Sequence, residues 1–251
     1  MKALILKASP KQDGNTATMA DALARGLRDG GVEDVVEFRL NEMTIRPCQA
    51  CDACLKPPHQ GCILDDDFMT IFPVFRDADV IVFAAPIYWW HINAQLKTFI
   101  DRMHPMLTYG RAHCLTTKRL IFLTAHFARD PYGVELAVKM FESIAGWAGM
   151  PFDALCYHSP TSHVRDCPEK LDEAYALGRS LENWVKPTLT LPCPVKGCGF
   201  EFPDVERLAM HIVMAAGDNH LKWKTEHLSE VHTLANTLTL RDEVLAILHE
   251  S

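Results

Sequence analysis

Four cysteines in the N-terminal half of the chain have a spacing that suits a metal cluster. They follow the pattern C-x2-C-x2-C-x7-C and are Cys48, Cys51, Cys54 and Cys62. Three thiolates at two-residue spacing can surround a cubane, and a fourth can arrive from a short loop. Because spacing alone does not specify the metal, three interpretations stay open: a [4Fe–4S] site, a reactive thiol pair and ordinary reduced thiols. In the first of these, the four sulfur atoms converge on one centre.

A second group of cysteines and histidines lies near the C-terminus. It follows the pattern C-x4-C-x12-H-x8-H and comprises Cys193, Cys198, His211 and His220. Two cysteines followed by two histidines are the ligands of many zinc fingers, although the last interval is longer than the usual three to five residues. We predict that a turn over residues 215–219 brings His220 back to the metal, with His227 as the alternative ligand. Four protein ligands leave no position for water, so the zinc is expected to be structural.

The residues around this second group predict a small ββα unit whose core contains Phe200, Phe202 and Leu208. Between Cys193 and Glu230 there are four Lys or Arg residues against six Asp or Glu residues, a net charge of −2. A negatively charged unit attracts phosphate backbones poorly. We therefore expect this unit to dock against a subunit or a redox partner, and not to bind nucleic acid.

A polar loop after the first strand candidate suits a phosphate group. Ser9 and Thr16 offer hydroxyl groups, and Lys11 offers a positive charge. Gly14 permits a tight turn, and Asn15 or Thr16 can cap the helix that follows. The unpaired N–H groups and the positive dipole end of a helix start attract anions. The same residues also describe a simple strand–helix connection, and they lack the GxxxxGK[ST] pattern of nucleoside triphosphate hydrolysis.

Aromatic side chains follow the third strand candidate, where the chain reads Pro86-Ile87-Tyr88-Trp89-Trp90. Three consecutive aromatic residues at a strand end cannot all face one core, so at least one should be presented for stacking on a planar ligand. Pro86 stiffens the turn. The alternative is packing beneath the loop or at a subunit interface, which we expect for one of the two tryptophans.

Alternating strands and helices must position these loops. Apolar and β-branched runs predict strands over 3–7, 34–39, 79–84, 119–124 and 152–157. Helical periodicity predicts helices over 16–28, 66–76, 92–103, 134–147 and 169–185. Such alternation implies a doubly wound α/β fold, with a parallel sheet covered by helices on both faces. Ligands of these sheets bind beyond the carboxyl ends of the strands, where the strand order reverses.

The two loops together resemble those of the NAD(P)H-dependent FMN reductase family, and within it the branch of iron–sulfur flavoproteins. The resemblance covers about residues 1–185 and rests on the segments 9–16, 86–89 and 95–102, the last reading Gln-Leu-Lys at its start and Asp-Arg at its end. It implies a flavodoxin-like five-stranded sheet with strand order 2-1-3-4-5. It also implies that the FMN phosphate is held by Ser9, Lys11, Gly14, Asn15 and Thr16. The residues implied to line the isoalloxazine are Pro86, Ile87, Tyr88 and Trp89.

Two features of the chain bear on this resemblance. The loop over residues 124–130 is bulky and polar, whereas the family often has a small glycine-bearing loop after the fourth strand. His126 in this loop can hydrogen-bond the flavin edge, but we expect instead an exposed side chain without that role. The four-cysteine pattern resembles the cluster motif of the iron–sulfur flavoproteins. Because it follows the second strand, we expect it at the same edge of the sheet as the flavin.

Length and composition fit one α/β domain with an appendage, which we place at residues 1–186 and 187–251, the boundary lying near Pro187. The net charge of −7 gives no general attraction to nucleic acid or anionic membranes. The apolar runs are too short to span a bilayer, and Lys2 begins a strand-like run rather than a signal peptide. We therefore expect a cytoplasmic protein with reduced thiols.

The leading hypothesis is an FMN-dependent oxidoreductase that takes electrons from NAD(P)H. Its acceptor would be a second flavin, a quinone, an Fe–S centre or a partner protein, and we expect a homo-oligomer. The flavin carries the chemistry, so no side chain is nominated as an acid or a base. One alternative is an FMN-binding electron carrier that does not use nicotinamide directly. Another is a redox-sensing regulator that binds nucleic acid through the zinc unit.

Overall fold

The computed structural model describes residues 1–56, 61–107, 113–128, 132–215, 217–230 and 236–250. Its main sheet has five parallel strands in the order β2-β1-β3-β6-β7, which confirms the predicted order 2-1-3-4-5. These strands are β1 (Lys2–Lys7), β2 (Asp34–Arg39), β3 (Val80–Ala84), β6 (Arg119–His126) and β7 (Phe152–His158).

Helices cover both faces of this sheet. Two of them, α1 (Asn15–Asp29) and α6 (Pro168–Arg179), pack over one face. The other face is covered by α2 (Phe68–Asp77), α3 (Ala94–Asp101) and α5 (Tyr132–Ala148), and the short α4 (His113–Thr116) precedes β6. None of the helices in the described segments is long and apolar enough to cross a membrane.

The predicted helix over 92–103 is wrong at its start, where a hairpin replaces its first residues. Strand β4 (Ile87–Tyr88) pairs with β5 (His91–Ile92), and α3 begins only at Ala94. The helix predicted over 169–185 also ends early, at Arg179, and a 3₁₀ turn over Ser180–Asn183 follows it. The other predicted helices and strands differ from the observed ones by two residues or fewer at most ends.

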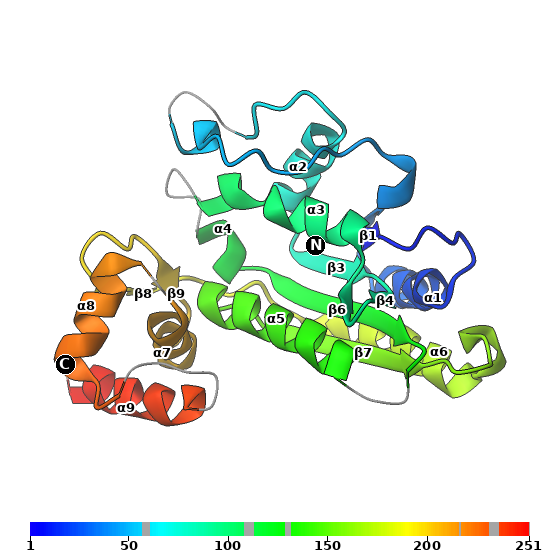
Figure 1. Cartoon of the computed structure of the whole chain (residues 1–251). Coiled ribbons are helices and arrows are strands. Elements are labelled where there is room, and N and C mark those ends of the chain that lie inside the picture. Colours follow the sequence, from blue (N-terminus) through cyan, green and yellow to red (C-terminus); the bar gives the residue numbers. More distant parts are fainter. Residues whose placement is uncertain (57–60, 108–112, 129–131, 216, 231–235, 251) are drawn as a thin grey trace.

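A smaller unit follows residue 187 and lies beside the C-terminal end of α5 (Figure 1). It contains the hairpin of β8 (Leu191–Pro192) and β9 (Glu201–Phe202), and the helices α7 (Val205–Met214), α8 (Asp218–His227) and α9 (Thr237–Glu250). Phe200, Phe202 and Leu208 are buried in its core, as predicted, and Trp147 of α5 packs against that core.

Candidate functional site

The two predicted flavin loops meet at one cavity of about 250 Å³. Strands β1 and β3 pair side by side, so the loops that leave their carboxyl ends are neighbours. The strand order reverses beside β1, which makes this the switch point where such sheets bind ligands. The residues lining the cavity are Ser9, Lys11, Gly14, Asn15, Thr16, Pro86, Ile87, Tyr88, Ala125, His126, Phe127 and Ser159.

One end of this cavity is formed by the start of α1. Gly14 is the N-cap and has no side chain with which to cap the helix, and a helix start of this kind presents its first-turn N–H groups to an anion. A Cβ at position 14 would lie 3.1 Å from Ser9 Oγ and 3.3 Å from Lys11 O. Ser9 and Thr16 are both buried, and Ser9 Oγ accepts a hydrogen bond of 3.2 Å from the Lys11 N–H. The loop therefore forms a tight cradle that a larger residue at position 14 would fill.

The side chain of Asn15, predicted to cap the helix or to help hold a phosphate, is engaged by the loop after β7. Its side chain donates to Ser159 Oγ at 2.7 Å and accepts from the Val164 N–H at 2.9 Å. These bonds tie the loop after β7 to the start of α1. Ser159 thereby enters the cavity, and the sequence analysis missed it because that loop has no motif of its own.

The aromatic turn between β4 and β5 has an unusual backbone. Trp89 and Trp90 have φ values of 48° and 60°, which are favoured in two-residue hairpin turns but disfavoured for bulky side chains. Both are exposed, by 89% and 53%, so neither packs beneath the loop, and packing of one of them at a subunit interface stays a prediction. Such strain persists where the surrounding structure maintains it, and it is concentrated at ligand-binding sites.

A second cavity of about 310 Å³ adjoins the first and is lined mostly by apolar side chains. Trp89 borders this second cavity with Trp90, and it is not among the residues lining the cradle. His126 and Phe127 border both cavities. His126 is half-buried, not exposed as expected, and whether it hydrogen-bonds a flavin stays a prediction. Its Nδ1 contacts Ala128 O at 3.0 Å, and its ring lies 5.1 Å from that of His158. Positions 129 and 130 of the bulky loop lie outside the described residues.

The four cysteines of the first motif border one cavity of about 160 Å³. Burial raises the pKa of the Cys54 thiol, and repulsion from Cys62, Cys51 and Cys48 raises it further. Only groups that lie near one another interact in this way. The structure thus brings the four thiols to one place, and the donor set fits an iron–sulfur cluster.

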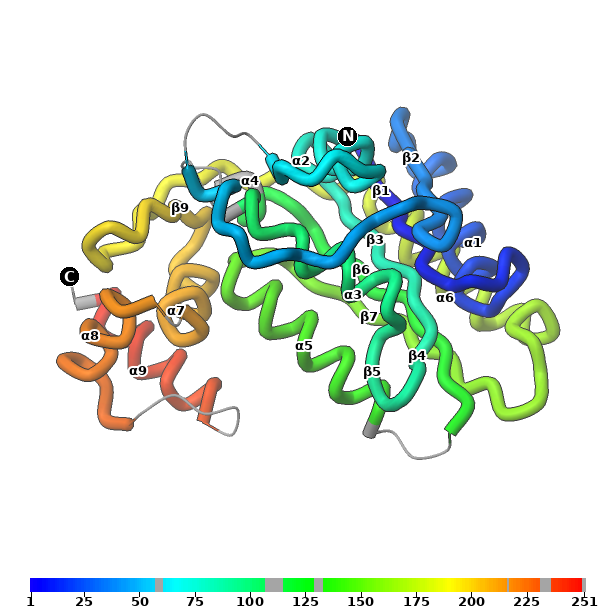
Figure 2. The backbone as a smooth tube through the Cα atoms, turned by 45° about the horizontal axis from the view of Figure 1, so that its top comes forward, coloured from blue at the N-terminus to red at the C-terminus, as the bar shows by residue number. Residues whose placement is uncertain are grey.

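The thiol cavity does not lie at the edge of the sheet where the sequence analysis placed the four cysteines. The chain after β2 runs back across the sheet (Figure 2), so the cysteines do not lie at the flavin edge. The thiol cavity is bordered by Arg102 at the end of α3, whereas Asn93 at the start of α3 bonds Ala8 O beside the cradle. A helix of eight residues is about 12 Å long, and this length separates the two sites.

The second motif forms a compact ligand set in the C-terminal unit. One ligand atom from each of Cys193, Cys198, His211 and His220 lies within 4.8 Å of the others. Cys198 Sγ and His220 Nε2 are each 3.1 Å from His211 Nε2. The hydrogen bond between the thiols raises the pKa of Cys193 and lowers that of Cys198, which favours one thiolate. Thiolate and imidazole are the ligands that zinc prefers.

Contacts around the ligand set orient it and connect it to α5. His211 Nδ1 is 2.7 Å from Trp147 O, so this nitrogen donates and leaves Nε2 for a metal. His220 lies in the first turn of α8, where the predicted turn brings it back, although position 216 of that turn lies outside the described residues. His227 is outside the set and stacks on Trp223.

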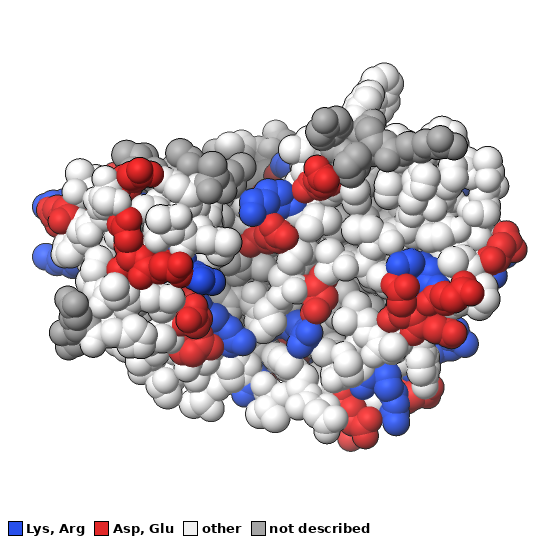
Figure 3. All heavy atoms as spheres, turned by 90° about the horizontal axis from the view of Figure 1, so that it is seen from below, with Lys and Arg blue, Asp and Glu red and all other residues white. Residues whose placement is uncertain are grey.

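The exposed face of the C-terminal unit carries mixed charges, and its helix α7 is largely covered. Helix α7, which a zinc finger would present to DNA, packs between α5 and α9. Acidic side chains gather over this unit on the face shown in Figure 3, where basic ones are interspersed among them. This agrees with the net charge of −2 between residues 193 and 230.

Comparisons with known proteins relate the chain to flavoproteins. A family model described as "Flavodoxin-like fold" matches residues 1–176. An iron–sulfur flavoprotein from Archaeoglobus fulgidus is 34% identical over 118 residues, which are 47% of this chain and 51% of that protein. A protein from Bacillus subtilis, provisionally named an NAD(P)H-dependent FMN-containing oxidoreductase, is 26% identical over 105 residues, 41% of this chain and 51% of that protein. The chain thus spans about half the length of the curated relatives it matches.

A solved structure supports the same fold. The NAD(P)H:quinone oxidoreductase from Methanothermobacter marburgensis superposes with a TM-score of 0.56 at 22% identity. The match covers 74% of this chain and 98% of that one. At this level of identity the likeness concerns the fold alone.

Proposed function

The chain belongs to the family with the flavodoxin-like fold, and from this premise we propose that residues 1–186 bind FMN and form an NAD(P)H-dependent oxidoreductase. The observation that carries the proposal is the meeting of the Ser9–Thr16 loop and the Pro86–Tyr88 loop at one cavity beside β1 and β3. When bound, FMN supplies hydride acceptance and electron transfer. The side chains of this protein bind, orient and shield it.

The phosphate would bind at the start of α1. The free N–H groups of the first turn and the positive end of the helix dipole attract an anion there. Ser9 and Thr16 add buried hydroxyl groups, and Lys11 adds a charge on the cavity wall. Asn15 would contribute through its position in the first turn, because its side chain is engaged by Ser159 and Val164.

The electron acceptor would use the neighbouring apolar cavity. Trp89, Trp90 and Phe127 border it and are exposed, so they can stack on a flat apolar molecule. This lining favours a quinone or a second flavin over a strongly charged acceptor. His126 lies between the two cavities and can hydrogen-bond to either occupant.

Two metal sites complete the proposal. Cys48, Cys51, Cys54 and Cys62 would hold a [4Fe–4S] cluster, which would exchange single electrons. The second ligand set, which is buried near Trp147, would hold a structural zinc that stabilises residues 187–251. A regulator acting on nucleic acid is disfavoured, because α7 is covered and the unit is acidic.

Binding of FMN is tested by fluorescence titration of the full chain. Ser9→Ala removes a hydroxyl from the cradle and should weaken FMN binding about tenfold, the loss of one hydrogen bond to a charged group of about 1.5 kcal/mol. Ser143→Ala is the matched control, because Ser143 is half-buried on α5 and its hydroxyl bonds only Lys139 O among the described residues. Unquenched flavin with the unmodified protein would refute FMN binding.

Use of nicotinamide is tested separately on the FMN-loaded protein. Stopped-flow mixing with NADH or NADPH without oxygen should bleach the flavin within one turnover. A protein that binds FMN and is bleached by dithionite, yet by neither nicotinamide, would be an electron carrier. An absorbance spectrum of anaerobically purified protein reports the cluster as a broad shoulder beneath the flavin bands.

A further inference from the structure

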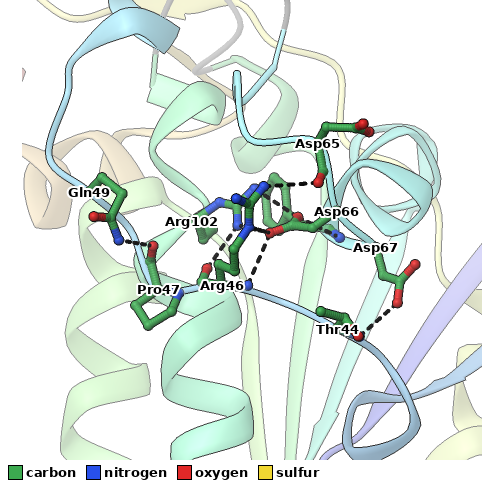
Figure 4. Close-up of polar contacts among 9 residues, drawn as sticks. Thr44, Arg46, Pro47, Gln49, Asp65, Asp66, Asp67 and Arg102 are labelled. Carbon is green, nitrogen blue, oxygen red and sulfur yellow. Dashed lines mark hydrogen bonds and ion pairs between the residues drawn. The ribbon is translucent and has the colours of Figure 1, made fainter.

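The base of the four-cysteine loop is closed by hydrogen bonds that do not involve the cysteines (Figure 4). Asp67 accepts from the Thr44 N–H at 2.7 Å, and Asp66 accepts from the Arg46 N–H at 3.0 Å. The Asp67 N–H donates to Thr44 O at 3.1 Å, and the Arg46 guanidinium donates to Asp65 O at 2.9 Å. The segments before Cys48 and after Cys62 are therefore held together by the protein itself.

Arg102 lies at the centre of this arrangement (Figure 4). Its guanidinium is fully buried and forms two parallel hydrogen bonds to Asp66, of 2.9 and 3.1 Å. It also donates to Arg46 O at 2.8 Å and lies 4.4 Å from the centre of the Phe68 ring. A buried cation of this kind is stable because it is paired and hydrogen-bonded.

One donor of this buried cation is unused. Among the described residues, Arg102 Nε has no hydrogen-bond partner, although it is fully buried. A buried N–H group without an acceptor is costly, so its retention points to an acceptor that completes the site. Arg102 borders the same cavity as the four cysteines, Cys62 among them. Sulfur atoms of a bound cluster would be acceptors at that position.

We propose that Arg102, held in place by Asp66, is the positioning residue that raises the reduction potential of a cluster bound by Cys48, Cys51, Cys54 and Cys62. This inference rests on the cluster assignment proposed above. One-electron reduction adds negative charge to the cluster, and a buried positive charge and N–H donor at its edge stabilise that reduced form. Asp66 opposes this effect with its own charge while fixing the orientation of Arg102.

Substitutions of Arg102 and of Asp66 should shift the reduction potential of the cluster in opposite directions. In the reconstituted full chain, Arg102→Gln should lower the cluster's reduction equilibrium constant about tenfold, a shift of about 59 mV for one electron. Arg102→Lys retains the charge and should lie between Arg102→Gln and the unmodified protein. Asp66→Asn leaves the cation uncompensated and should raise the potential. A purely structural role would instead admit water to the cluster in both cases and shift both variants in the same direction.

The measurement is an anaerobic dithionite titration followed by absorbance and electron paramagnetic resonance, with iron and sulfide determined on each sample. Arg119→Gln is the control, since it removes another Arg–Asp pair, one that is partly exposed and joins β6 to β7. The flavin potential of each variant serves as an internal reference and should stay unchanged.

The outcomes separate this inference from the cluster assignment. Equal potentials in Arg102→Gln and the unmodified protein, at equal iron content, would overturn the role of Arg102 alone. Shifts of the same sign in Arg102→Gln and Asp66→Asn would also overturn it. Absence of iron and sulfide from the reconstituted unmodified protein would overturn the cluster and this inference together. Should Arg102→Gln load no iron, Arg102→Lys and Asp66→Asn decide the question by the sign of their shifts.

Discussion

Loss of one zinc ligand should weaken the metal site without affecting the flavin. Structural zinc contributes on the order of 10–16 kcal/mol to small modules. Shared over four ligands, this is about 3 kcal/mol each, or roughly a hundredfold in zinc affinity. His220→Ala removes an imidazole that is 7% exposed and whose Nε2 lies 3.1 Å from His211 Nε2. We therefore expect zinc to dissociate from His220→Ala at chelator concentrations that leave the unmodified protein loaded.

The flavin should be unaffected because α5 separates the two sites. Gly133 and Val134 border the acceptor cavity at one end of α5, and Trp147 contacts the zinc ligands at the other. Seventeen helical residues span about 25 Å. Metal loss should loosen residues 187–251, because the four ligands are then no longer joined through the metal, and weaker contacts such as the hydrophobic core around Phe202 remain.

The assay combines zinc stoichiometry by a chromogenic chelator, limited proteolysis of the 187–192 linker and FMN titration. His227→Ala is the matched control, because His227 stacks on Trp223 outside the ligand set. Two results would refute the reasoning. If His227→Ala loses zinc and His220→Ala does not, the ligand assignment is wrong. If FMN is released together with zinc, the two sites are coupled and the separation along α5 is irrelevant.

Three other predictions concern stability and acceptor binding. Gly178→Ala would place a methyl group against Leu23 O, where α6 crosses α1. It should lower the free energy of unfolding, measured by urea titration, by about 3 kcal/mol. An unchanged unfolding midpoint would disprove this close contact. Trp90→Gly should raise the free energy of unfolding by about 1 kcal/mol, because glycine adopts a positive φ without strain. The same variant should raise KM for a quinone, because Trp90 borders the acceptor cavity. Lower stability would show that this turn is unstrained. Burial acts to raise the pKa of Asp66, but Arg102 and backbone N–H groups outweigh it and hold that pKa below its usual value. The carboxylate therefore stabilises the fold above the unfolded-state pKa of about 3.9, and this contribution is lost as the pH falls through the lower folded-state pKa; Asp66→Asn should abolish that part of the acid transition measured by circular dichroism.

The sequence alone predicted the order of the sheet, the loop at the start of α1 and the grouping of two cysteines with two histidines. The apolar periodicities of strands and helices depend on residues close in sequence. Their alternation along the chain could therefore be predicted, and it implied a parallel sheet. The turn at Gly14 is also a local feature, although Gly14 itself is the N-cap of α1 and not Asn15 or Thr16 as predicted. The C-x4-C-x12-H-x8-H spacing sufficed to group four ligands, because a hairpin and a helix between them leave few other arrangements.

Only the tertiary structure decided where the loops between these elements lie. The four-cysteine loop crosses to the far end of α3 because Arg102 pairs with Asp66, a contact between residues 36 positions apart. Ser159 enters the cradle through Asn15, which is 144 positions away. The zinc unit docks on α5 through Trp147, 64 positions before His211. Such contacts depend on how the packed elements meet in space, and neither periodicity nor local spacing carries that information.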